Sequence, residues 1–456
     1  MKTSKPRAGI VLASHTREPT SFSLGLLNKG IKAMGDGDIE IIFNGKAAVD
    51  DRGIRDAIKE LKDKDVDLYI IVAGNWIEPP VLSHPLEEIR GQNILLLGFP
   101  ESMEMIKEGH FLGSNSAFTV LRNSMKQMDF RFRDIQKFPY REDAVREIKD
   151  FAHASRASRE MRRVKMGLIG YCSMGIYTTC FDQLKIRSVF GVEIDSYADS
   201  YLLYDQMMKV EEKRTGPVLE ELKKRCQIDE QVVKNGSLDK SLKMYLALKD
   251  MAEERDWKGV TVKCQHEYST FLKCTACLPL SLLTDDGLMC TDEGDVHALV
   301  TMIAMNELSG KSEPLYFGDI YKLEEGGFLM GHCGLSPHSC AADSSGINLF
   351  PQSPRISLDG RTTGGVISNY MFREGPVTIG RIENDRQGSY YFHFTRGNIK
   401  AIEPLANRWS SLVFTPDSGQ EAFADNQLAN HYIFIYDDIE DRVRDFCFIN
   451  GLKVLE

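Results

Sequence analysis

The sequence predicts the α/β fold class, with two Rossmann-like, doubly wound α/β domains followed by a β-rich α+β C-terminal domain. Short runs rich in Ile, Val and Leu alternate with amphipathic segments at the start of the chain, and a second such series begins near residue 165. Beyond residue 285, strand and hairpin patterns dominate. Strands that alternate with helices form parallel sheets. A chain of 456 residues is also too long for a single hydrophobic core. We therefore expect three domains, at residues 1–163, 164–285 and 286–456.

The first domain is expected to hold a parallel sheet. Strand-length apolar runs lie at residues 9–13, 38–43, 68–73 and 93–98. Between them, residues 51–62 repeat apolar side chains at the period of an amphipathic helix, namely Ile54, Ala57, Ile58 and Leu61. Ligands bind such sheets at the carboxyl ends of the strands. Arg17 and Trp76 follow two of these strands, so we expect them near a ligand.

The second domain begins after a charged helical stretch at residues 141–163. Strands are expected at residues 165–170, 190–194 and 259–263. The polar stretch at residues 204–255 predicts helices, broken at Gly216-Pro217 and Asn235-Gly236.

The third domain is predicted to be β-rich with helices. Strands at residues 377–382 and 390–394 flank a hairpin turn at 384–388, and a further strand at 432–436 precedes a closing helix at 439–448. One more helix is expected at residues 296–308, ahead of Gly310.

Composition excludes several classes of protein. With 42% hydrophobic and 27% charged residues, the chain is globular. No apolar run approaches the ~18–20 residues that cross a bilayer, and the short apolar start predicts a strand and not a signal peptide. We therefore expect a cytoplasmic protein with no membrane partner. A net charge of −10 with dispersed basic residues argues against nucleic-acid binding.

Cysteines and glycines allow two further hypotheses. Cys274 and Cys277 form a C-x-x-C flanked by Cys264 and Cys290, which allows either a structural zinc site or four buried, reduced thiols; the irregular spacing favours thiols. The glycine runs contain neither a dinucleotide fingerprint nor a Walker motif, so nucleotide binding is not expected.

Residues 290–297, which lead into the expected helix, concentrate three carboxylates and an imidazole: Asp292, Glu293, Asp295 and His297. One interpretation is an acidic helix N-terminus that complements the helix dipole. The other is a cation site. A strand at residues 315–317 follows the helix and ends near Asp319, and a right-handed crossover would place Glu293 and Asp319 at one sheet edge. Two carboxylates there repel unless a cation or a shared proton holds them.

Two histidines extend this candidate site. His332 follows an expected strand at residues 328–330, and His431 immediately precedes the strand at 432–436. Each could be a purely structural histidine. Together with Glu293 and Asp319 they form a mixed oxygen and nitrogen set that suits Mn²⁺, and less uniquely Mg²⁺, Co²⁺ or Fe²⁺.

These motifs resemble the L-fucose isomerase / L-arabinose isomerase superfamily. The resemblance lies in Glu293-Gly-Asp295 before a helix, Phe317-Gly-Asp319 after it, Gly331-His332-Cys333, and Ala429-Asn430-His431-Tyr432 before the last strand. The series of two α/β domains and a β-rich one agrees over the whole chain. The chain is shorter than typical fucose-type members and fits neither branch wholly.

The resemblance implies a role for each matching residue. Glu293 and Asp319 match metal-binding carboxylates that also carry protons, and His431 matches a metal histidine of both branches. His332 matches a ligand of the arabinose-type branch only. Arg17 resembles an arginine that reaches the substrate in a neighbouring subunit, and Trp76 occupies a comparable strand end. A homo-oligomer with active sites shared between subunits is also implied.

The resulting hypothesis is a manganese-dependent aldose–ketose isomerase. Its substrate would be a free pentose, a 6-deoxyhexose, or a sulfonated 6-deoxyhexose such as sulfoquinovose, isomerised through a cis-enediol. His266 could face the substrate or lie at the surface. Two alternatives from other classes are a non-catalytic sugar-binding protein and a metal-dependent sugar epimerase or lyase.

Overall fold

The computed structural model describes residues 5–15, 20–35, 37–110, 112–265, 267–353, 363–403, 405 and 407–456. The chain forms two compact units. The first comprises Met1–Arg159 and Asp441–Ile449, and the second Glu160–Glu440 and Asn450–Glu456. The division into three domains stays a prediction. In the part of the chain that the structure describes, no helix is long and apolar enough to cross a membrane.

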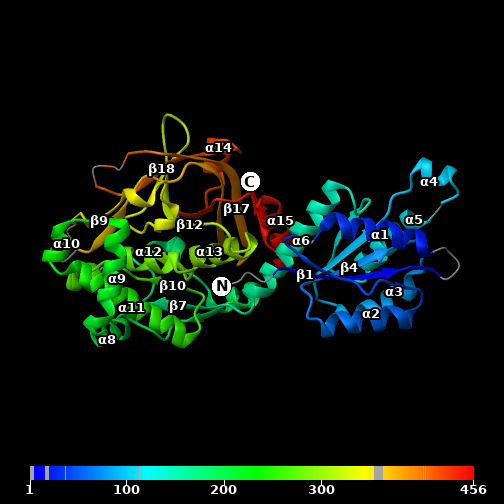
Figure 1. Ribbon diagram of the computed structural model, residues 1–456, viewed down its shortest axis with the longest axis horizontal. Coiled ribbons are helices and arrows are strands. Elements are labelled where there is room, and N and C mark those ends of the chain that lie inside the picture. The colour runs from blue at the N-terminus through cyan, green and yellow to red at the C-terminus, as the bar shows by residue number, and fades with distance from the viewer. Residues whose placement is uncertain are drawn as a thin grey trace. The chain divides into compact units, whose positions relative to one another are not determined.

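The first unit contains a parallel sheet with strand order β2-β1-β4-β5-β6, to which β3 adds beside β1. The strands are β1 (Arg7–Ala13), β2 (Glu40–Ile42), β3 (Ala47–Ala48), β4 (Leu68–Ala73), β5 (Ile94–Gly98) and β6 (Arg133–Gln136). The helices are α1 (Thr20–Met34), α2 (Asp51–Asp63), α3 (Pro79–Leu86), α4 (Met103–Lys107), α5 (Ser114–Gln127), α6 (Glu142–Met161) and α15 (Glu440–Asn450). Figure 1 shows α1 and α2 on opposite faces of this sheet, so the expected doubly wound arrangement is present.

The second unit begins with another parallel sheet, of order β11-β10-β7-β8. Its strands are β7 (Lys165–Ile169), β8 (Glu193–Asp195), β10 (Gly259–Val262) and β11 (Met289–Asp292). The helices around it are α7 (Gln183–Phe190), α8 (Ser200–Lys209), α9 (Glu212–Arg225), α10 (Glu230–Lys234), α11 (Ser237–Arg255), α12 (Cys277–Asp285) and α13 (Val296–Leu308). A small sheet adds β9 (Cys226–Ile228), β14 (Ile347–Pro351) and β15 (Val366–Asn369).

The β-rich part of this unit closes into an antiparallel barrel. The path runs β16-β19-β12-β13-β18-β17, and pairing of β16 with β17 closes it. The elements are β12 (Leu315–Lys322), β13 (Phe328–Gly331), β16 (Gly375–Asn384), β17 (Tyr390–Ala401), β18 (Ser411–Pro416), α14 (Gln420–Asp425) and β19 (His431–Ile435), with β20 (Lys453–Leu455) beside β17. The chain is therefore a mixed α/β protein with parallel sheets and a C-terminal antiparallel barrel.

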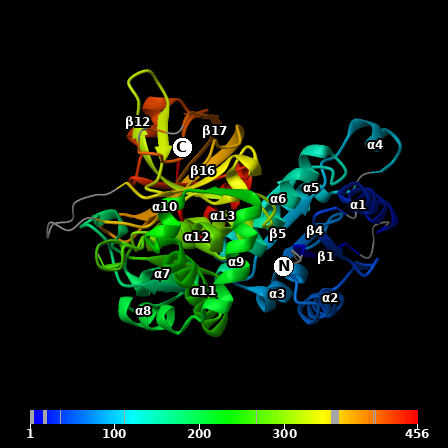
Figure 2. The ribbon, with the colours of Figure 1, turned by 60° about the vertical axis from the view of Figure 1, so that its left-hand side comes forward.

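Helix α13 joins the two layers of the second unit. It contacts β10 and β11 of the parallel sheet as well as β12, β16 and β19 of the barrel, and it lies between them in Figure 1 and Figure 2. Apart from Asn306, all of its residues are buried. A helix that is apolar on every side is the kind that packs inside a core.

The expected crossover from β11 to β12 is wrong. β11 pairs in parallel with β10, whereas β12 pairs antiparallel with β13 on one edge and with β19 on the other. Both edges of β12 are thus occupied, and no edge remains for β11.

Two other local expectations are corrected. Helix α9 runs through Gly216-Pro217 instead of breaking there, because the burial of Thr215 and Leu222 on either side of the pair holds the helix in place despite the hydrogen bond that an interior proline removes. Phe190 ends a helix and does not begin a strand; Asp182 caps α7 and Gly191 ends it with left-handed backbone.

Asp445 makes the stability of the first unit depend on pH. It lies on α15 and is 6% exposed. Burial raises the pKa of Asp445 to about 7, with Arg133 opposing the rise and Asp150 adding to it. An unfolded chain would release this proton near pH 3.9. The folded state is therefore favoured below about pH 4, and this contribution is lost as the pH rises to about 7.

We expect Asp445→Asn to be more stable than the native chain at high pH only. Its advantage in free energy of unfolding should grow from near zero at pH 4 to about 2–4 kcal/mol at pH 8, measured by urea unfolding. Asp56→Asn, an exposed carboxylate of α2 in the same unit, is the control and should change stability by less than about 0.5 kcal/mol. A pH-independent difference for Asp445→Asn would contradict the assignment.

Candidate metal centre

Glu293 stands on a tight turn between β11 and α13. Glu293 and Gly294 both adopt left-handed backbone, with φ of 62° and 70°. A Cβ at Gly294 would clash with the Tyr171 carbonyl oxygen, so the position requires glycine. The Glu293 N–H donates to Asp292 Oδ1 at 2.8 Å, and its carbonyl accepts from the Ser173 N–H at 3.0 Å. Left-handed backbone at a non-glycine residue costs on the order of 1 kcal/mol and persists where its surroundings hold it.

The other three candidate residues come from neighbouring barrel strands. Asp319 lies within β12, directly opposite His431, the first residue of β19. On its other side Asp319 pairs with Gly331, the last residue of β13, and His332 follows at once. The antiparallel register of the barrel therefore brings these residues together, and the turn after β11 adds Glu293.

Glu293, His332 and His431 form the tightest group. One potential ligand atom of each lies within 4.8 Å of the others. His431 Nε2 is 3.4 Å from Glu293 Oε2 and 3.5 Å from Asp319 Oδ1. Glu293, His332 and His431 are 5%, 1% and 0% exposed, whereas the Asp319 side chain is 20% exposed. Asp319 therefore marks the more open side of the group.

Both imidazoles present an Nε2 atom that has no hydrogen-bond partner within the described ranges. A buried polar atom without a partner costs free energy, about 1–3 kcal/mol. Imidazole nitrogens and carboxylate oxygens form a mixed donor set that suits Mn²⁺, Mg²⁺, Co²⁺ or Fe²⁺. The four residues could hold such an ion, which would satisfy both Nε2 atoms at once.

The electrostatics of the group favour a cation. Burial lowers the pKa of an imidazole, but Asp295 and Glu293 outweigh it and raise the pKa of His431 to about 10. Burial also lowers the pKa of His332, but Cys333, Asp319 and Glu293 outweigh this effect and raise the pKa of His332 to about 10. Both shifts show that the carboxylates around these imidazoles favour positive charge between them. A divalent ion would supply that charge.

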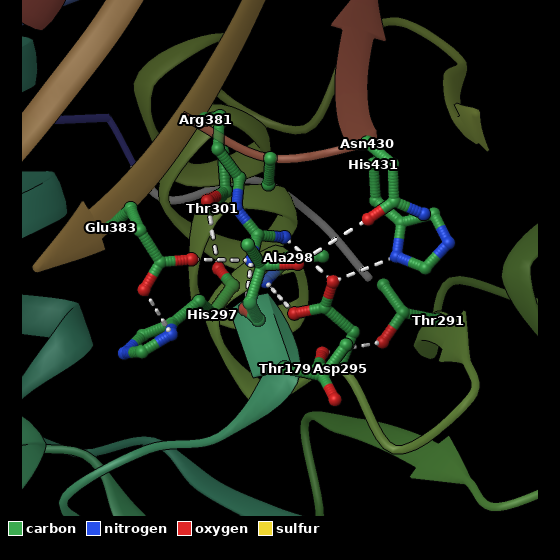
Figure 3. A network of polar contacts seen from close by, with 12 residues as sticks. Thr179, Thr291, Asp295, His297, Ala298, Thr301, Arg381, Glu383, Asn430 and His431 are labelled. Carbon is green, nitrogen blue, oxygen red and sulfur yellow. Dashed lines mark hydrogen bonds and ion pairs between the residues drawn. The ribbon is translucent and has the colours of Figure 1, made fainter. Parts of the chain in front are cut away.

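Asp295 orients His431. It is the N-cap of α13, where its Oδ1 accepts from the Ala298 N–H at 2.9 Å, and its Oδ2 lies 2.8 Å from His431 Nδ1 (Figure 3). This contact holds the Nδ1 proton on the side of Asp295 and leaves Nε2 facing Glu293 and Asp319. Carboxylates commonly fix metal-binding histidines in this way.

Arg381 keeps this carboxylate ionised. Its guanidinium donates to Asp295 Oδ2 at 2.7 Å and to Glu383 Oε2 at 2.7 Å, and Asp295 and Arg381 are fully buried. Glu383 also lies 2.8 Å from His297 Nδ1, which completes the network in Figure 3. Burial alone would raise the pKa of Asp295, but Arg381 and His431 hold it far below its usual value.

Of the remaining predicted residues, Trp76 belongs to the other compact unit, and Arg17 and His266 lie outside the described ranges. Trp76 follows β4 in the first unit, is 41% exposed, and donates its backbone N–H to the Leu112 carbonyl at 2.9 Å. The substrate-binding roles of Arg17, Trp76 and His266 stay predictions.

The four cysteines of the zinc hypothesis are buried. Cys274 Sγ lies 3.8 Å from Ser241 Oγ, and Cys290 Sγ lies 3.1 Å from the Leu288 carbonyl oxygen. Neither belongs to a metal-ligand group of the described chain. Cys274 and Cys290 therefore behave as buried thiols.

The chain is similar to proteins named sulfoquinovose isomerase. It is 23% identical over 340 residues to those of Priestia aryabhattai and Priestia megaterium, covering 73% of this chain and 72% of each relative. It is 22% identical over 367 residues to that of Alkalicoccus urumqiensis, covering 78% of both chains. No family model matches the chain. Similarity over most of the chain to these enzymes indicates an isomerase. Membership of the L-fucose isomerase / L-arabinose isomerase superfamily stays a prediction.

We expect Asp295→Asn to weaken metal binding, because an asparagine keeps the helix cap but loses the charge that orients and polarises His431. The Mn²⁺ affinity should fall about 10–100-fold, measured by equilibrium dialysis. Glu383→Gln is the matched control: it removes a carboxylate from Arg381 without touching His431. It should destabilise the fold but leave Mn²⁺ affinity unchanged. Equal losses of affinity in both variants would reduce Asp295 to a structural role.

Proposed function

We propose that the protein is a divalent-metal-dependent aldose–ketose isomerase acting on a free sugar, with sulfoquinovose as the first substrate to test. The convergence of Glu293, His332 and His431, with two unpartnered imidazole nitrogens, supports the metal. The similarity to sulfoquinovose isomerases supports the reaction and the sugar. Mn²⁺ is the proposed ion because the donor set lacks sulfur and mixes oxygen with nitrogen.

Isomerisation moves one proton between C1 and C2 of the sugar and another between O1 and O2. A bound divalent ion would supply positive charge beside the sugar oxygens, where negative charge develops. Glu293 and Asp319 both lie within 3.5 Å of His431 Nε2, so two carboxylates face one small space. We propose that one takes the C2 proton and returns it to C1, while the other serves the hydroxyl protons.

The surroundings of the two carboxylates suit these tasks. Asn430 Nδ2 donates to Asp319 Oδ1 at 2.8 Å, which fixes the orientation of a carboxylate that is otherwise partly exposed. Glu293 is nearly buried and is held by the strained turn after β11. Fixed carboxylates lose little entropy when a substrate arrives. Either assignment of the two proton-transfer roles fits the distances.

The metal-loaded protein should convert sulfoquinovose into its ketose, followed by NMR, and chelation should stop the reaction until Mn²⁺ is restored. Pentoses and 6-deoxyhexoses complete the panel. Exchange of the C2 proton in D₂O without ketose formation would indicate an epimerase or lyase instead. Sugar binding without exchange would indicate a binding protein.

Glu293→Gln and Asp319→Asn should each lower turnover about 10²–10⁴-fold, with the circular dichroism spectrum unchanged, because each removes a proton-accepting oxygen and keeps the side-chain shape. Asp286→Asn is the control: this carboxylate pairs with Lys249 at 2.7 Å at the end of α12 and should leave turnover unchanged. Full activity in either Glu293→Gln or Asp319→Asn would remove that residue from the proposed mechanism.

A further inference from the structure

A second cluster of potential ligand atoms lies beside His332. Its members are Cys277 at the start of α12, Asp292 at the end of β11, and Cys333 directly after His332. The two Sγ atoms and a carboxylate oxygen of Asp292 lie within 4.8 Å of one another. Cys333 Sγ is 3.6 Å from His332 Nδ1, the ring nitrogen that the metal group above does not use. The two clusters therefore adjoin without sharing a donor atom.

The cluster is enclosed by protein. Cys277 and Asp292 are 0% exposed and Cys333 is 5% exposed. Asp292 Oδ1 accepts from the Glu293 N–H, but Asp292 Oδ2 has no hydrogen-bond partner in the described chain. A carboxylate oxygen that is buried beside two thiols and lacks a donor is costly, and a cation would satisfy it. This oxygen is the independent sign that something binds here.

Cys264 lies just beyond β10 and is 1% exposed. Its thiol interacts electrostatically with Asp292 and Cys333, although it is not one of the three residues whose ligand atoms lie within 4.8 Å of one another. Cys277, Cys333 and Asp292 supply three donors, and Cys264 would bring the number to four, which is usual for Zn²⁺ and related d¹⁰ ions. Thiolates select soft ions, whereas the group of Glu293, His332 and His431 contains no sulfur.

We propose that Cys277, Cys333 and Asp292, with Cys264 as a fourth donor, form a second cation site that takes a thiophilic d¹⁰ ion such as Zn²⁺ or Cd²⁺. The site does not depend on the proposed function, because an ion can bind here whether or not the protein isomerises a sugar. Its donors differ in hardness from those of the neighbouring centre, so the two sites select different ions. Binding releases the protons of the thiols that become ligands.

The test uses the reduced full-length protein, first saturated with Mn²⁺ so that the nitrogen and oxygen group is occupied. Cd²⁺ is then titrated and followed by its thiolate charge-transfer absorption in the ultraviolet. We expect about one further equivalent to bind with that absorption. Cys277→Ser and Cys333→Ser should each weaken this binding at least tenfold, and Asp292→Asn should weaken it while keeping the absorption. Cys447→Ser, a buried cysteine of α15, is the matched control and should bind as the native chain does.

X-ray absorption at the cadmium edge gives a second measurement, made on the native chain. It remains informative even if the cysteine variants fail to fold. Sulfur neighbours around the bound Cd²⁺ support the site. Binding through nitrogen and oxygen alone, no binding beyond the first site, or native affinity in both folded cysteine variants would overturn the proposal. None of these outcomes depends on sugar turnover, so the proposed function is judged separately.

Discussion

The second unit depends on one buried carboxylate. Asp295 caps α13, pairs with Arg381 of β16, and holds His431 of β19, all with full burial. A buried charge is tolerated only when it is paired and hydrogen-bonded, and removing one partner costs about 3–5 kcal/mol. Asp295 therefore links the helix that follows the parallel sheet to two strands of the barrel. The hydrogen bond between Asp295 and His431 Nδ1 thus helps to hold the core together and also leaves His431 Nε2 as the ring nitrogen that faces Glu293 and Asp319.

Local sequence patterns predicted most elements because periodicity and capping act over a few residues. The helix expected at residues 296–308 and the strand at 68–73 have the observed bounds. Patterns could not predict partners. The apolar pattern predicts only a short strand at residues 315–317. The observed strand β12 continues through Asp319 to Lys322, because β13 pairs with one of its edges and β19 with the other. The barrel likewise depends on pairings between distant segments, such as β19 with β12 and with β16, which no window of sequence contains.

The candidate site shows the same division. Four polar residues next to strand boundaries could be singled out, and the structure places all four near one another. The predicted crossover from β11 to β12 is wrong, because Glu293 follows a strand of the parallel sheet whereas Asp319 lies in the barrel. The two residues therefore meet across two sheets and not along one sheet edge. Asp295 had a visible signal, a carboxylate directly before a helix, but its bond to His431 spans 136 positions. Arg381 carries no such signal, because a charged residue within an apolar strand does not reveal its partners.

The order of these residues along the chain has a consequence for biosynthesis. Glu293 precedes the barrel, whereas His431 belongs to β19, which comes after the other five strands of the closed barrel in the sequence. On the ribosome the parallel sheet can form well before the strand that completes the group has been translated. The four residues can meet only after residue 431 has been translated. A chain released before β19 would lack His431 together with the strand that pairs with β12 and β16, so neither the barrel nor the four-residue group could be completed.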